Sequence, residues 1–86
     1  MEEKEIGYVS NFFGHLSVAA IELTDGPLMS GDTIHFKGHT TDFQCKVESI
    51  QIEHQTASQA KKGDSIGLKI SEKARKADKV FIVTGV

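Results

Sequence analysis

The chain has few of the features that mark extracellular or membrane proteins. Its 86 residues contain a single cysteine, so no disulfide can form within the chain. Disulfide frameworks are typical of small domains in oxidising compartments, and their absence here favours the cytoplasm. The N-terminal segment MEEKE is acidic and is no secretory signal. Apolar runs such as 18–21 and 80–83 are far shorter than the roughly 20 residues of a membrane helix. We therefore expect no membrane partner.

Motifs for nucleotides are also missing. A phosphate loop combines several glycines with a lysine followed by serine or threonine, and it leads into a helix. The segment KKGDSIGL (61–68) has none of these and leads into an alternating, strand-like pattern. The sequence therefore predicts a turn at this place and no bound nucleotide or other cofactor.

Metal-ligating and catalytic patterns are missing as well. There is no CxxC, and no HxxxH on a predicted helix: His35 and His39 are four apart in or beside a predicted strand, and His54 is nine residues from Cys45. Cys45 lies on an apolar strand face with Phe43 and Val47, where burial disfavours a reactive thiolate. We expect no metal site and no enzymatic activity.

Helical periodicity is hard to find, and alternation takes its place. In DTIHFKG, Ile34 and Phe36 share one face, and SIGLKIS repeats this two-residue period. Such alternation is typical of half-buried strands, so residues 1–86 are expected to form one all-β domain. The connections are 54–62 and 71–77, and the first four residues are expected to be loose. The predicted strands are 5–12, 16–23, 32–37, 42–54, 65–71 and 79–84.

Two strands change phase, which favours a curved sheet. In 42–54, Phe43 and Val47 occupy odd positions, whereas Ile50 and Ile52 occupy even ones. An extra residue near 48–49 would turn both sets inward, as a β-bulge or corner does. The segment 16–23 shows a similar change from 16, 18 and 20 to 21 and 23. Strands that turn corners predict a small closed six-stranded β-barrel. Its predicted core contains Ile34, Phe36, Val47, Ile66, Leu68 and Ile70.

Three predicted strands follow a small residue and an aspartate. In Gly31–Asp32 and Gly63–Asp64 the glycine can adopt the positive φ of a tight turn, and the aspartate can accept backbone hydrogen bonds. At Ala77–Asp78 an alanine replaces the glycine, so this turn is expected to avoid positive φ.

Charge is uneven along the chain. Residues 1–60 carry three basic and nine acidic side chains, a net of −6, and residues 61–86 carry seven basic and three acidic ones, a net of +4. Such an asymmetry can steer an anionic partner to one face, although a solvated surface explains it equally simply. The candidate contacts are Lys61, Lys62, Lys73, Arg75, Lys76 and Lys79.

Adjacent aromatic residues form a second candidate contact. Phe12 and Phe13 are neighbours, so in a strand one of the two rings faces outward. An exposed ring beside basic side chains can stack on an unpaired base, and it can also cover an end of the barrel or meet another chain.

The order of these elements resembles the second, β-barrel domain of elongation factor Tu and other translational GTPases. The resemblance runs over the whole chain and is nearest to short stand-alone elongation-factor-like proteins. FKGHTTDF (36–43) is similar to a barrel at the C-terminus of some collagenase-like peptidases. The motifs that carry the likeness are Ile6-Gly7-Tyr8-Val9, Val18-Ala19, Leu28, Gly31-Asp32-Thr33-Ile34, Val47-Glu48-Ser49-Ile50, Ala60 to Leu68, and Asp78-Lys79-Val80.

The resemblance implies a barrel of the translation-factor second-domain type and a binding role without catalysis. Two functional hypotheses follow. The first is a translation-linked module that contacts RNA or a ribonucleoprotein through the basic C-terminal third. The second is a barrel that binds proteins or docks substrates beside a separate enzyme such as a peptidase. They differ in whether the basic residues and the outward phenylalanine share one face.

Overall fold

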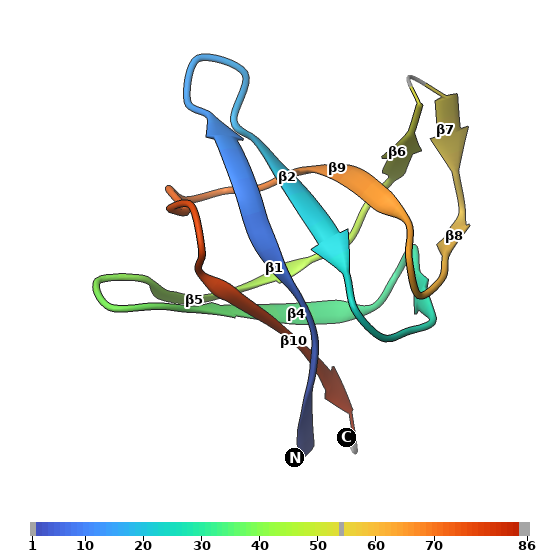
Figure 1. Ribbon diagram of the computed structural model, residues 1–86, viewed down its shortest axis with the longest axis horizontal. Coiled ribbons are helices and arrows are strands. Elements are labelled where there is room, and N and C mark those ends of the chain that lie inside the picture. Colours follow the sequence, from blue (N-terminus) through green and yellow to red (C-terminus); the bar gives the residue numbers. More distant parts are fainter. Residues whose placement is uncertain (1, 54, 85–86) are drawn as a thin grey trace.

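The computed structural model of the chain describes residues 2–53 and 55–84 (Figure 1). Regular structure in these residues consists of strands, without a helix, so none of it can cross a membrane as a helix. Each of the six predicted strands overlaps an observed one. The strands are β1 (Glu2–Phe13), β2 (Val18–Leu23), β3 (Leu28–Met29), β4 (Thr33–Lys37), β5 (Asp42–Lys46), β6 (Ile50–Ile52), β7 (Gln55–Ala57), β8 (Gln59–Ala60), β9 (Ser65–Lys69) and β10 (Lys79–Thr84).

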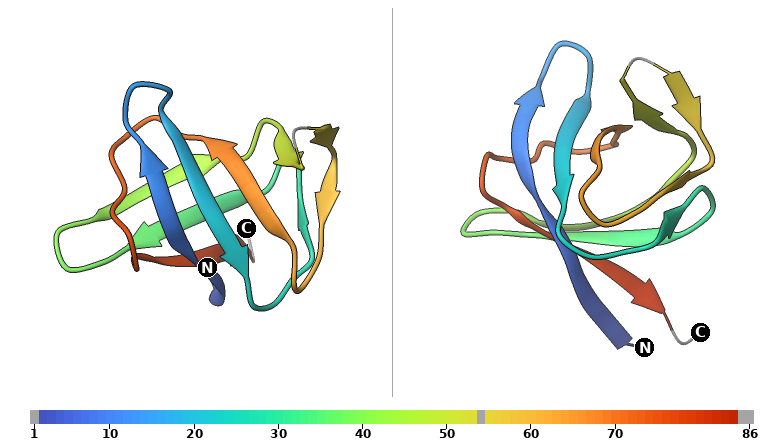
Figure 2. Two further views of the ribbon diagram at one scale, coloured as in Figure 1. Left: turned by 45° about the horizontal axis from the view of Figure 1, so that its top comes forward. Right: turned by 45° about the vertical axis from the view of Figure 1, so that its right-hand side comes forward.

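The strands form one curled antiparallel sheet and a small second one. The order in the large sheet is β5-β4-β10-β1-β2-β9-β6-β7, and β3 pairs with β8. The hydrogen-bonded sheet remains open between β5 and β7. However, β5 and β6 are separated by only residues 47–49 in the chain, so the chain itself joins distant parts of the sheet (Figure 2). The all-β architecture is confirmed, whereas the predicted closed six-stranded barrel is not seen: the described residues form ten strands in two sheets, and the large sheet does not close into a ring.

The corner predicted near 48–49 is present. The segment breaks at 47–49: β5 pairs with β4, and β6 pairs with β9. Phe43 and Val47 before the break are buried, and so is Ile50 after it. Val47 donates its N–H to Asp32 O at 2.8 Å and accepts from Gly31 N–H at 2.7 Å. Because the break adds the extra residue, both halves turn their apolar side chains inward.

The phase change predicted within 16–23 is wrong. Ala19, Ile21 and Leu23 are buried in regular alternation, so Val18 and Ala20 face outward. Register shifts lie instead in β1: between Glu5 and Gly7 in its pairing with β10, and between Val9 and Asn11 in its pairing with β2.

Gly7 shows why β1 carries the irregularity. A Cβ built at this position would lie 2.3 Å from the carbonyl oxygen of Glu22. Only glycine permits this close backbone approach. The N-terminal residues also differ from the expectation of a loose end, because Glu2–Lys4 pair with β10.

The core is the concave face of the curled sheet. All six predicted core residues are buried, each with at most 5% of its surface exposed. Phe36 of β4 stacks on Phe43 of β5 with ring centroids 4.9 Å apart and planes 12° from parallel. Full burial of such side chains stabilises the fold by roughly 1.5–3 kcal/mol each.

Three turns of the same design lead into β4, β9 and β10. The carboxylates of Asp32, Asp64 and Asp78 each accept a hydrogen bond from the backbone N–H three residues earlier, at 2.9, 2.9 and 2.7 Å. The backbone N–H of each aspartate donates in return to the carbonyl oxygen of the residue three positions earlier, at 3.1, 3.0 and 3.0 Å. Such a four-residue turn with positive φ at its third residue has the signature of type II.

The third position carries positive φ in all three turns. Gly31 has φ 97° and Gly63 has φ 93°, as predicted. Ala77 has φ 76°, so the expectation that this turn avoids positive φ is wrong. The aspartate pairing imposes the same backbone on each turn, and Ala77 tolerates a strained conformation because its N–H is anchored to Val9 O at 2.7 Å.

The two variants Gly63→Ala and Ala77→Gly should therefore change stability in opposite directions. No atom lies within 4 Å of a Cβ built on Gly63, so only the backbone conformation is strained there. We expect Gly63→Ala to lower the free energy of unfolding by about 1 kcal/mol. Ala77→Gly relieves the strain of positive φ and should raise the free energy of unfolding by up to about 1 kcal/mol. The gain is reduced by the conformational entropy that glycine adds to the unfolded chain. Urea unfolding followed by circular dichroism measures both, and a loss of stability in both variants would contradict the shared turn geometry.

Candidate functional site

The outer surface carries a groove between two hairpins. The β1–β2 hairpin and the β6–β7 hairpin both project from the sheet, with β9 between them (Figure 1). The hollow has a volume of about 570 Å³, and we call it the outer groove. It is lined by Phe13, Leu16, Val18, Ala20, Glu22, Ser49, Gln51, Glu53, Ser65, Ile66, Gly67 and Lys69.

Strand alternation builds the floor of this groove. Burying Ile66 and Leu68 of β9 turns Ser65, Gly67 and Lys69 to the outside. Across the sheet, Gly67 is paired with Ala20 on one side and with Gln51 on the other. In the middle of the groove Gly67 and Ala20 have little or no side chain, and this leaves a hollow bordered by Gln51.

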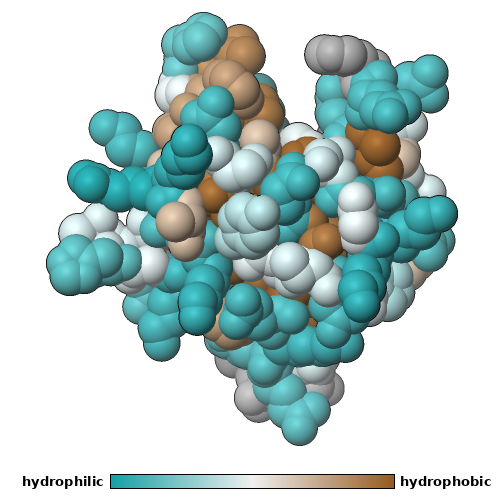
Figure 3. Space-filling view, in the orientation of Figure 1, coloured by the Kyte–Doolittle hydropathy of each residue, from teal (hydrophilic) through white to brown (hydrophobic). Residues whose placement is uncertain are grey.

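One wall of the outer groove is apolar. Phe13 is 40% exposed and Leu16 is 55% exposed, and the outward Val18 continues the same surface. Figure 3 shows apolar surface on the hairpin at the upper left, beside the notch. Phe12 packs against the core, which confirms that only one of the two adjacent rings faces outward. Leu16 was not predicted as a contact residue.

The charged side chains of the outer groove are separated along its length. Lys69 is paired with Val18, at the apolar end. Glu22 is paired with Ser65, at the other end. Glu53 follows β6, beyond Gln51, the last residue of β6 that pairs with β9. Within residues 2–53 and 55–84, none of these three side chains takes part in an ion pair. The groove is thus apolar at the end that holds Lys69, and Glu22 lies at the other end.

The six predicted basic contacts do not gather at one place. The β8–β9 connection lies beside the end of β2, where Gly63 donates its N–H to Leu23 O at 2.9 Å. The β9–β10 connection begins at the other end of β2, where Ile70 donates to Ser17 O at 2.9 Å. Lys61 and Lys62 are in the first connection, whereas Lys73, Arg75 and Lys76 are in the second. Lys79 starts β10, with its Nζ 3.9 Å from Glu5 Oε1. The strands β9 and β10 are not neighbours, because β1 and β2 lie between them.

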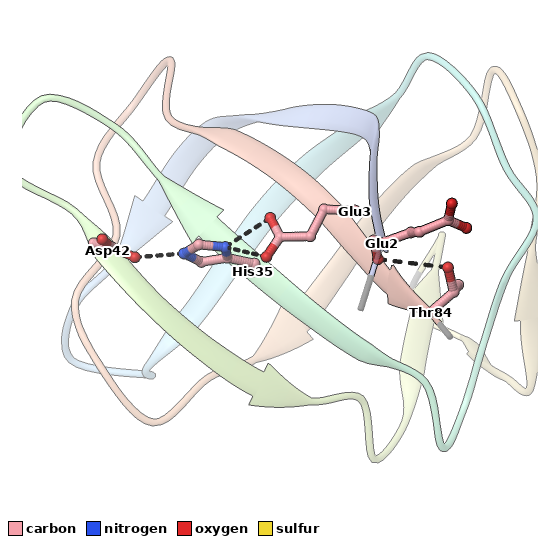
Figure 4. Close-up of polar contacts among 5 residues, drawn as sticks. All are labelled: Glu2, Glu3, His35, Asp42 and Thr84. Carbon is pink, nitrogen blue, oxygen red and sulfur yellow. Dashed lines mark hydrogen bonds and ion pairs between the residues drawn. The ribbon is translucent and has the colours of Figure 1, made fainter. Parts of the chain in front are cut away.

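A histidine clamp joins three strands away from the groove. His35 of β4 contacts Glu3 of β1 through Nδ1, at 2.9 and 3.0 Å, and Asp42 of β5 through Nε2 (Figure 4). The ring is 6.4 Å from the Phe81 ring and only 13% exposed. The hydrogen bond to Asp42 has the largest effect on the pKa of His35, followed by the one to Glu3. Both raise this pKa, whereas partial burial of the ring lowers it. Since both nitrogens face carboxylates, the protonated ring fits this site best.

Metal or nucleophile chemistry has little support in the described residues. Among residues 2–53 and 55–84, no three histidine, cysteine, aspartate or glutamate side chains are placed to hold a metal ion. Cys45 is a free, half-buried thiol packed against the core. His54, considered with it as a ligand, lies outside the described residues. Among the described residues, the lining of the outer groove contains serine hydroxyls and glutamate carboxylates, and neither histidine nor cysteine.

Comparison with known proteins shows that the chain is similar to parts of proteins that are named as peptidases. It is 42% identical over 80 residues to an uncharacterised protease of Methanocaldococcus jannaschii, covering 92% of this chain and 19% of that protein. It is 39% identical over 77 residues to a collagenase of Porphyromonas gingivalis, covering 88% of this chain and 21% of that protein. The chain thus spans about a fifth of the length of the curated relatives it matches. No protein-family model matches it.

Solved structures share the fold. The C-terminal domain of a Geobacillus thermoleovorans protein named as a U32 peptidase superposes with a TM-score of 0.85 at 16% identity, covering 92% of this chain and 91% of that domain. Its selenomethionine variant gives a TM-score of 0.83. These comparisons confirm the predicted likeness to the C-terminal barrel of collagenase-like peptidases. None of these proteins is named as an elongation factor.

The histidine clamp predicts a pH-dependent contribution to stability. Because the pKa of His35 is raised in the folded state, its contribution is fully present below the unfolded pKa, near 6.5, and is lost as pH rises through the raised folded value. We expect His35→Gln to destabilise the chain more at pH 5.5 than at pH 8.5. Urea unfolding of both proteins at the two pH values measures the difference. An equal loss at both pH values would mean that the imidazole is not charged in the folded protein.

Proposed function

We propose that this chain is a non-catalytic domain that binds extended protein segments beside a collagenase-like peptidase. The observation that carries the proposal is the outer groove, an apolar-walled hollow of about 570 Å³ on the outside of a sheet whose fold is shared with a peptidase C-terminal domain. Binding sites typically have volumes of about 300–1,000 Å³ and apolar linings with a few polar groups.

The absence of catalysis is part of the proposal. General acid–base or nucleophilic chemistry needs a base within hydrogen-bonding distance of a nucleophile. Among the described residues that line the outer groove, the hydroxyls of Ser49 and Ser65 have no histidine beside them. The peptidase activity named for the relatives belongs to proteins about five times longer than this chain.

The RNA hypothesis has weaker support. Its basic residues lie at opposite ends of β9 rather than on one connection, and the outward Phe13 borders a groove that holds two glutamates and one lysine. An acidic groove repels phosphate. A translation-linked role and a cytoplasmic location remain predictions.

The proposal predicts that filling the groove floor weakens protein binding. Gly67 lies in a strand, and a Cβ there would meet only Val18 Cγ1 at 3.6 Å and Gln51 Cβ at 4.0 Å. The variant Gly67→Val should therefore fold while occupying the hollow. We expect the wild-type chain to bind a permanently unfolded protein, reduced and carboxymethylated α-lactalbumin, and Gly67→Val to bind it about tenfold more weakly.

Two controls accompany this measurement by biolayer interferometry. Gln44→Val places the same valine side chain on the exposed face of β5, outside the groove, and should leave binding unchanged. Transfer RNA at low salt tests the alternative partner, with the Lys73, Arg75 and Lys76 triple alanine variant as its control. Binding of transfer RNA but not of unfolded protein would replace the present proposal with the RNA hypothesis.

A further inference from the structure

Three residues at the apolar end of the outer groove are direct cross-strand neighbours. Phe13 of β1 is paired with Val18 of β2, and Val18 is paired in turn with Lys69 of β9. All three line the groove. The Cβ atoms of such paired residues lie about 4.5–5.5 Å apart. An apolar surface and an ammonium group therefore stand side by side across the groove, at one level along its length.

The ammonium group of Lys69 has no carboxylate paired with it. Within residues 2–53 and 55–84 this lysine takes part in no ion pair, and it is the one basic residue among the described residues of the lining. Glu22 is four residues from Val18 along β2, roughly 13 Å, which exceeds a Debye length of about 8 Å. β6 begins beside Leu68, next to Lys69, and Glu53 follows its other end. A ligand can therefore supply the anion that Lys69 lacks.

The relative placement of the apolar surface and the cation selects one part of a ligand chain. In an extended chain that lies along the groove, consecutive side chains point to opposite sides, and residues i and i+2 are about 6.6 Å apart along the chain. A bulky side chain and a carboxylate from two different residues would thus lie one behind the other. A C-terminal residue carries both groups on one Cα and presents them at the same level, as Val18 and Lys69 require.

Building on the proposed function, we propose that the outer groove binds the C-terminal end of an extended protein chain whose last residue is bulky and apolar. Lys69 pairs with the terminal carboxylate, and Phe13, Leu16 and Val18 cover the last side chain. Phe13 and Leu16 are exposed in the free chain, so covering them removes apolar surface from water. Glu22 repels a carboxylate at the other end of the groove, which fixes the direction of the bound chain.

The residues before the chain end lie over the shallow middle of the groove. β2 and β9 each have a paired strand on both sides, so the backbone groups of the floor are used within the sheet. The side-chain amide of Gln51, which borders the hollow, offers a donor and an acceptor to a peptide group of the ligand. The chain end therefore carries most of the selectivity.

The test uses four N-acetylated eight-residue peptides built from glycine and serine. The first ends in phenylalanine with a free carboxylate, and the second is its C-terminal amide. The third has a free carboxylate but ends in serine. The fourth is an amide in which aspartate follows phenylalanine by two residues, so that its carboxylate belongs to a side chain. Dissociation constants come from the amide shifts of Gly67 and Lys69 in NMR titrations.

We expect the first peptide to bind about threefold more tightly than its amide or the aspartate peptide, as suits an exposed ion pair. The serine peptide should bind about tenfold more weakly than the first, because it leaves the apolar wall in water. In Lys69→Gln the first peptide and its amide should bind equally. Lys62→Gln removes a lysine outside the groove and should keep the preference. In the wild-type chain the preference should also fall at high salt, a readout that needs no variant.

The outcomes separate this inference from the proposed function. Equal affinity of the wild-type chain for the first peptide and its amide would overturn the inference. A preference that survives in Lys69→Gln, or equally tight binding of the aspartate peptide, would overturn it as well. The proposed function would then stand if unfolded α-lactalbumin still binds to the wild-type chain and more weakly to Gly67→Val. A wild-type chain that binds neither α-lactalbumin nor any of the peptides would overturn both.

Discussion

The fold depends on how three turns fix the first residue of a strand. In a sheet with one buried face, a slip of one residue moves every inward side chain to the outside. Asp32, Asp64 and Asp78 each close their turn with two hydrogen bonds: the carboxylate accepts one from a backbone N–H, and the backbone N–H of the aspartate donates the other. In each case the residue two positions later is buried: Ile34, Ile66 or Val80. The turn thus sets the register of β4, β9 and β10.

The same register produces the binding surface. When Asp64 directs Ile66 and Leu68 inward, Gly67 must face outward between Ala20 and Gln51. A strand one residue out of register would place an isoleucine or a leucine there instead of the shallow floor. Core and groove are therefore two faces of one alternation, and a change that disturbs the turn at Asp64 affects both. The groove also needs no rearrangement to bind, because three paired strands already hold its floor, and such preorganisation lowers the cost of association.

The main strands and the core could be predicted from the sequence, but the outer groove could not. Alternation and the aspartate turns are local patterns, so they predict β4, β9 and β10 and the buried positions 34, 36, 66 and 68. The outer groove combines residues from β2, β6 and β9, which are far apart in the chain and become neighbours only through the sheet order. Apolar residues on both faces of 16–23 predict a phase change, whereas Val18 and Ala20 are outward residues of a regular strand.

The basic residues of the C-terminal third show that a charge pattern along the sequence does not predict a charged surface unless the strand order is known. Residues 61–62 and 73–76 are close in sequence, and a linear reading puts them in one patch. They flank β9, however, and the ends of this five-residue strand are roughly 13 Å apart, beyond a Debye length of about 8 Å at physiological salt. The two groups are therefore largely screened from each other and cannot act as one electrostatic site. Glu22, Glu53 and Lys69 lie in three separate segments of the sequence, yet they line one hollow. Which charged side chains share a surface is therefore decided by which strands are neighbours rather than by which residues are consecutive.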